Sequence, residues 1–242
     1  MKKLLFILFM IVSISAQSQV LITLLLGDKL NSDGLEFGLE GGLNWTKISG
    51  LETKRFDRRW NLGFYFDIRV KNQWSVYTGV LVKANMGVAD LSDNDILKLG
   101  VSTYNDSNGL IIGEYSHKMS YFIVPILMKY KLKNHLFFAA GPQFGLMYKS
   151  WFEFDSDIDG KDAIVKEYNK DQINKIDMGV TAAIGYRMWK GTGWSIAAKY
   201  YYGFVDVYKD VKGTKNSGFY IEVNIPIGAG EKPPKKEKEI SN

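Results

Sequence analysis

The 242-residue chain contains no cysteine and only two histidines. Without cysteine it can form neither disulfides nor thiolate metal sites, and it lacks the residue that a lipoprotein acylates. Beyond the N-terminal region, no apolar run approaches the roughly 20 residues that a transmembrane helix needs. These absences exclude a disulfide-stapled secreted domain, a lipoprotein and a helical membrane protein. Proline is also scarce, with five residues, whereas aromatic residues make up 14% of the chain.

The N-terminus has the pattern of a secretory signal. Lys2 and Lys3 precede the apolar run Leu4–Ile14, and small residues follow, including Ala16 and Ser18. We predict a signal peptide over residues 1–18, cleaved after Ser18. The alternative is an uncleaved anchor, because the next segment is apolar as well, but the polar residues 17–19 interrupt it.

The rest of the chain alternates between apolar and polar residues, as a strand with two different faces does. In Trp60–Val70 every second residue is apolar, and the intervening residues are polar or glycine. Most of these stretches reach the roughly 9–11 residues that a tilted strand needs to cross a bilayer, and no helix is indicated between them. The predicted strands are Leu35–Thr46, Trp60–Val70, Trp74–Met86, Tyr121–Leu132, Leu136–Tyr148, Ile176–Met188, Trp194–Phe204 and Phe219–Ile227.

The connections between these strands are alternately short and long. Three are tight, namely residues 71–73, 133–135 and 189–193, and the other four are longer: Lys47–Arg59, Gly87–Ser120, Lys149–Lys175 and Val205–Gly218. Outer-membrane barrels have short periplasmic turns and long extracellular loops. Aromatic residues near the strand ends fit membrane-interface girdles.

We therefore predict an all-β fold: an eight-stranded antiparallel up-and-down transmembrane β-barrel over residues 35–228, in the cell outer membrane. A periplasmic N-terminal segment, residues 19–34, precedes it, and its apolar part Val20–Asn31 could plug the barrel, lie on the membrane or dock on a partner. A disordered charged tail, residues 229–242, follows.

The polar faces of these strands predict a barrel filled by charged side chains. An eight-stranded barrel has room for little more than its own side chains, and buried charges need partners. We expect a packed network of ion pairs and hydrogen bonds and no constitutive pore. In the third strand, Lys83 is predicted to face inward and Met86 outward. The predicted inward charges are Glu36, Glu40, Asp67, Asp177, Glu222, Arg69, Lys83, Lys129, Lys131, Arg187 and Lys199.

Two patterns could carry chemistry. His117 lies near Glu114, Ser116 and Ser120, which raises the possibility of a serine hydrolase, although adjacent residues on a strand face opposite ways. Asp155, Asp157 and Asp159 begin like a calcium-binding loop, but the expected final glutamate is Lys166, with Glu167 one place late. His135 is interpreted as a solvated turn residue. We predict no catalytic, cofactor-binding or metal-binding residue and no cofactor.

Several motifs resemble the PorT-like outer-membrane β-barrel family, across nearly all of the predicted mature chain. They are Glu36–Asn44, Tyr121–Tyr130 with its internal Pro125, Ala140–Pro142, Met178–Gly179, Gly185–Arg187 and Lys199–Gly203. The resemblance implies an eight-stranded barrel in the outer membrane. It also implies that a role in type 9 secretion or gliding-related export is possible, because some members have one.

The sequence thus predicts a non-enzymatic outer-membrane barrel that supports envelope integrity or a secretion or assembly complex. The expected partners are outer-membrane lipid and secretion or envelope proteins, and no nucleic-acid module is present. The alternatives are an outer-membrane lipid-modifying hydrolase and a small ligand-binding barrel.

Overall fold

The computed structural model describes residues 34–227, except positions 54, 107–108, 111–112, 159–160 and 192. The predicted signal peptide, the segment 19–33 and the charged tail 229–242 lie outside the described residues. None of the helices in the described part is long and apolar enough to cross a membrane.

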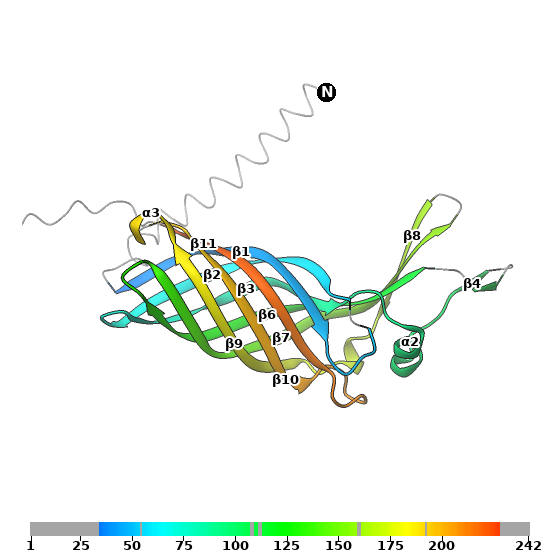
Figure 1. Ribbon diagram of the computed structural model, residues 1–242. Coiled ribbons are helices and arrows are strands. Elements are labelled where there is room, and N and C mark those ends of the chain that lie inside the picture. The colour runs from blue at the N-terminus through cyan, green and yellow to red at the C-terminus, as the bar shows by residue number, and fades with distance from the viewer. Residues whose placement is uncertain are drawn as a thin grey trace, which may run out of the picture.

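Eight long strands form a closed antiparallel ring (Figure 1). Around the ring the order is β6, β3, β2, β1, β11, β10, β9 and β7, and β7 pairs again with β6. Each strand therefore has a neighbour on both sides, which leaves no open edge in the membrane. The ring confirms the predicted eight strands. They are β1 (Leu35–Ile48), β2 (Asp57–Lys71), β3 (Trp74–Val88), β6 (Glu114–Lys131), β7 (Leu136–Ile158), β9 (Ile176–Arg187), β10 (Ser195–Asp206) and β11 (Lys215–Pro226).

The remaining elements lie at the two ends of the ring. The short helix α3 (Met188–Gly191) lies at the end with the tight turns, whereas α2, β4 and β8 gather at the opposite end (Figure 1). We call these the short-turn end and the long-loop end. The elements of the long-loop end are α2 (Asp93–Leu99), β4 (Asn105–Asp106), β5 (Gly109–Leu110), β8 (Lys161–Tyr168) and the 3-10 turn η1 (Lys170–Gln172).

Helix α2 was not predicted from the sequence. The Ser92 hydroxyl accepts a hydrogen bond from the Asp95 amide at 3.1 Å, and Gly100 ends the helix with a left-handed φ of 65°. Serine and glycine at these places are standard capping residues. A seven-residue helix is too short to display a clear 3.6-residue period, which is why the pattern does not reveal it.

The strands β6 and β7 extend well beyond their predicted bounds into the long-loop end. The register of this pair shifts between Ser120 and Tyr121. Past that bulge three successive residues, Tyr115–His117, are all buried. Because both faces of the extension are covered, the alternating pattern that identifies a half-buried strand disappears there.

The outward face of the ring is apolar, and the inward face is polar. Along β9, exposed Ile176, Met178 and Val180 alternate with buried Asp177 and Thr181. Aromatic pairs lie at the short-turn end, where the ring centroids of Trp74 and Tyr130 are 4.7 Å apart and those of Trp189 and Trp194 are 5.8 Å apart.

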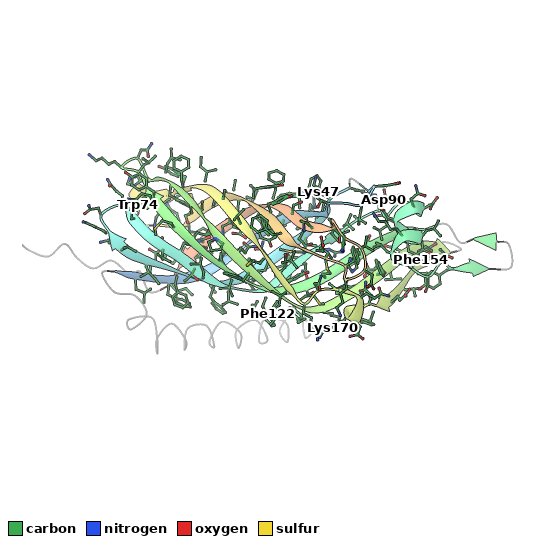
Figure 2. All side chains as sticks on the ribbon, turned by 90° about the horizontal axis from the view of Figure 1, so that it is seen from below. Lys47, Trp74, Asp90, Phe122, Phe154 and Lys170 are labelled. Atoms are coloured by element: carbon green, nitrogen blue, oxygen red, sulfur yellow. The ribbon has the colours of Figure 1, made fainter. Side chains whose placement is uncertain are left out.

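At the long-loop border of the apolar band, Trp60 and Tyr148 are exposed. In Figure 2, Trp74 marks the short-turn end, and Phe154, which lies beyond the border residue Tyr148, marks the long-loop end. The structure thus places aromatic side chains at both borders, as the prediction of two girdles required.

The predictions for Lys83 and Met86 were wrong. The pairing of β3 with β6 shifts between Leu81 and Ala84, so that Val82 and Lys83 both face outward. The Lys83 ammonium lies 3.8 Å from the centroid of the Trp60 ring, and Met86 is buried inside. A β-bulge adds one residue and inverts the faces beyond it, which the alternation alone does not reveal.

The orientation of β9 predicts a depth-dependent effect of charge on its outward face. Val180 lies in the middle of this apolar face, and Ile176 lies at its long-loop border. We expect Val180→Arg to lower the free energy of unfolding by about 2–4 kcal/mol and Ile176→Arg by only about 0–1 kcal/mol. The measurement is chemical unfolding in lipid vesicles, and equal losses for both variants would contradict the assigned outward face.

Candidate functional site

The lumen of the barrel holds a buried charge cluster. The Lys199 ammonium, on β10, forms ion pairs with the carboxylates of Glu40 on β1 and Glu222 on β11. Asn61 donates a further hydrogen bond to Glu222 at 3.2 Å. Both glutamates are almost completely buried. We call this the Lys199 cluster. It spans the β1–β11 pair and stabilises the seam where the first and last strands of the described part meet.

Aromatic and amide side chains fill the lumen around this cluster. The Tyr77 hydroxyl accepts a hydrogen bond from Asn224 at 2.7 Å, and the Asn216 amide donates to the Asp177 carboxylate at 2.9 Å. Tyr65 and Tyr77 stack with their ring centroids 5.6 Å apart. These contacts agree with the predicted packed polar interior.

Two further ion pairs lie toward the short-turn end. The Lys129 ammonium is 2.6 Å from the Asp67 carboxylate, and Arg187 donates two hydrogen bonds, of 2.9 and 2.5 Å, to Glu36. Beyond them opens a cavity of about 440 Å³, which we call the mouth cavity. The predicted inward cations Arg69 and Lys131 line it rather than the closed interior.

An apolar cluster closes the long-loop end of the lumen. It contains side chains from α2, from the parts of β3, β6 and β7 nearest the long-loop end, and from the loop between β10 and β11. We call this cluster the plug. Its members include Val88, Leu91, Ile96, Leu99, Met119, Phe152, Phe154, Ile173, Val207 and Tyr208. Burial of these side chains orders the long loops into a small hydrophobic core above the membrane.

His117 lies within the plug and contacts side chains from three other segments of the chain. Its Nε2 lies 2.9 Å from the Ser150 hydroxyl and 3.2 Å from the Asn169 amide, and its Nδ1 lies 2.7 Å from the Tyr208 hydroxyl. Ser150 in turn donates to the Asn169 carbonyl oxygen at 2.7 Å. The imidazole thus ties β6 to β7, to the residue after β8 and to the loop after β10.

Burial determines the protonation of this histidine. His117 pairs with Phe152, four residues beyond the border residue Tyr148, so it lies outside the membrane-spanning part. Its complete burial lowers the pKa of the imidazole to about 3, because desolvation penalises the charged form. His117 is therefore neutral at pH 7 and acts as a hydrogen-bonding centre.

The predicted companions of His117 lie elsewhere. Glu114 pairs with Arg55 at 3.1 Å, Ser120 donates to Asn85 at 3.0 Å, and Ser116 lines a separate polar cleft. The serine that contacts the imidazole is Ser150, 33 residues away in the chain. No local spacing could have revealed this pair, because only the β6–β7 register brings it together.

The serine–histidine pair lacks an accessible nucleophile. Ser150 is 1% exposed and surrounded by the plug. The third group near the imidazole is an amide or a phenol rather than a carboxylate, so the imidazolium of a triad mechanism would lack its usual stabilising anion. This arrangement suits a structural hydrogen-bond centre.

Two of the three candidate calcium residues lie in a hairpin. Asp155 and Asp157 belong to β7 and pair with Ile164 and Asp162 of β8, while Asp159 lies outside the described residues. Extended β7 backbone at these two positions replaces the compact loop that wraps a calcium ion. Within the described part, no three histidine or acidic side chains group as a metal site would require.

The Lys199 cluster predicts a strong, rescuable defect. Lys199→Met leaves two carboxylates buried without their cation and is expected to lower the free energy of unfolding by about 3–5 kcal/mol. The triple variant that adds Glu40→Gln and Glu222→Gln removes the stranded charges and is expected to recover most of this loss. Guanidinium unfolding in detergent gives both values, and a triple variant no better than Lys199→Met would refute the ion-pair account.

The burial of His117 predicts a pH effect with a defined sign. Between the folded pKa of about 3 and the ordinary value of 6.5, the unfolded chain binds a proton that the folded chain excludes, so stability falls as the pH drops below about 6.5. Lowering the pH from 7 to 5 should therefore cost the wild-type protein on the order of 1–2 kcal/mol more than His117→Gln. Parallel pH profiles of unfolding for the two proteins would contradict this.

No curated protein matches the chain. Among solved structures, the chain is similar to Ail, the attachment invasion locus protein of Yersinia pestis, with 14% identity, coverage of 81% of this chain and 99% of that chain, and a TM-score of 0.42. It is also similar to neisserial surface protein A, with 11% identity, coverage of 80% and 99%, and a TM-score of 0.42. For OprG of Pseudomonas aeruginosa the identity is 10%, the coverage 80% and 93%, and the TM-score 0.36.

These distant structural similarities do not bear on function. The family model described as "Outer membrane protein beta-barrel domain" matches residues 16–209, which is most of the chain. The match agrees with the closed eight-stranded ring, the apolar outward face and the polar lumen. The protein is located in the outer membrane, and the chain belongs to the outer membrane protein beta-barrel domain family.

Proposed function

We propose that this protein is a non-enzymatic barrel of PorT-like type that binds a protein partner in a secretion or envelope assembly. The observation that carries the proposal is the hairpin of β7 and β8, which extends beyond the barrel at the long-loop end (Figure 1). We call these two paired segments, residues 151–158 and 161–168, the hairpin.

The hairpin has the features of a docking element. β8 is the last strand in the sheet order, with β7 as its neighbour, so its other edge ends the sheet in the described part of the chain. Ile164, Val165 and Tyr168 are 56%, 39% and 64% exposed. Exposed apolar residues beside a free strand edge favour the addition of a partner strand.

The filled lumen supports a binding role over a transport role. From the short-turn end to the long-loop end, the lumen is occupied in turn by the two ion pairs, the Lys199 cluster and the plug. Steady passage of a solute would require these contacts to break together. The buried Ser150 also favours a non-enzymatic role over lipid hydrolysis.

The hairpin predicts the outcome of a native purification. We expect wild-type protein isolated from outer membranes in mild detergent to carry a stoichiometric protein partner. Ile164→Asp combined with Tyr168→Asp should reduce the recovered partner about tenfold or more, because each apolar contact is replaced by a charge at the interface. Quantitative mass spectrometry measures the recovery.

A matched control is available at the same end of the molecule. Leu97 on α2 is 78% exposed and lies outside the hairpin, so Leu97→Asp should leave the partner bound. A barrel that purifies alone, or equal loss in the control, would contradict the proposed function.

A further inference from the structure

Most of the charged side chains that line the mouth cavity at the short-turn end are cations. It opens where β1, β2, β6 and β9 end or begin, and its volume is about 440 Å³. Two carboxylates line it, Glu36 and Asp67, against five cations. The five cations are Arg69, Lys129, Lys131, Lys133 and Arg187.

Ion pairing accounts for only two of these cations. Asp67 is 2.6 Å from the Lys129 ammonium, and Glu36 receives two hydrogen bonds from Arg187. In the described part of the chain, no carboxylate lies within ion-pair distance of Arg69, Lys131 or Lys133. The Lys131 ammonium donates to the Gly191 carbonyl at 3.3 Å, which leaves its charge unneutralised. Counted over the described residues, the lining of the cavity therefore carries three positive charges in excess.

The walls of the mouth cavity offer further contacts to an anionic ligand. Buried Phe137 lies beneath the Lys129 ammonium, which is 4.2 Å from the ring centroid. Ser75, Gln73 and Asn72 supply polar groups. The volume of the cavity lies within the roughly 300–1,000 Å³ range of ligand sites.

We propose that the mouth cavity binds an acidic peptide segment of a partner protein on the periplasmic side. The partner protein in this proposal rests on the proposed function. The excess charges come from β2, β6 and the turn between β6 and β7, so they are matched by several carboxylates along a chain rather than by one small anion. The cavity lies within the ring of strands, whereas bilayer lipids contact the outward face.

The alternative is a solvated positive rim with no selective site. The structure offers a control that separates the two cases, because Lys71 is an exposed lysine at the same end, two residues from Arg69, and does not line the cavity. A diffuse positive field would depend on Lys71 as much as on the cavity lysines.

The test uses the purified full-length barrel in detergent and a fluorescein-labelled hexaglutamate peptide, with fluorescence anisotropy as the readout. We expect saturable binding that weakens with salt, as screening requires, and no binding of labelled hexaglutamine. Lys131→Gln combined with Lys133→Gln should raise the Kd about tenfold. Lys71→Gln should leave it within about twofold, and Lys131→Arg with Lys133→Arg should retain binding.

Several outcomes would overturn the proposal. They are equal weakening by Lys71→Gln, equal binding of hexaglutamine, and displacement of the peptide by inorganic phosphate or citrate at the peptide's own Kd, which would indicate a small-anion site. Unchanged heat-modifiable mobility on gels shows that the glutamine variant is folded, and the arginine variant tests charge independently of folding.

The two proposals can fail separately. Hexaglutamate binding by a barrel that purifies without a partner would support the acidic-peptide site and remove the proposed function. Absence of hexaglutamate binding in a barrel that purifies with a partner would overturn the site and leave the proposed function in place.

Discussion

The structure depends on one constraint: in a lipid bilayer, every backbone N–H and C=O group must find a partner within the protein. The pairing of β1 with β11, over eleven residue pairs from Gly38 to Ile48, meets this constraint because it closes the ring. Closure fixes the number of strands as even and brings both ends of the barrel domain to the short-turn end. It also creates a narrow lumen whose inward side chains must satisfy one another.

The lumen follows from that closure. Charged residues that face inward have little water available, so they are stable only as pairs, and the Lys199 cluster joins the first and last strands at the seam itself. The plug then covers the lumen at the long-loop end. A barrel filled in this way leaves its two ends as the places where other molecules can bind. The hairpin lies at one of these ends and the mouth cavity at the other.

The long-loop end shows how a tertiary core can order what the sequence presents as loops. Helix α2, the extensions of β6 and β7 and the hairpin all lie in segments expected to be long connections. His117 contacts Ser150, Asn169 and Tyr208, which come from three other segments. The serines close to it in sequence are not the serine it contacts, because strand register and not sequence distance determines the neighbours of an imidazole.

The sequence by itself determined the class of fold, the number of strands, the tight turns and the apolar outward face. These features depend on alternation of period two and on local turn residues, which are properties of short segments. The charged lumen was also predictable, but its pairing was not, since Lys199 could have met any inward carboxylate. Only the tertiary structure decided the faces of Lys83 and Met86, the partners of His117 and the gathering of Arg69, Lys131 and Lys133 around one cavity. Bulges, register and ring closure set these contacts, and each of them depends on strands that are distant in the chain.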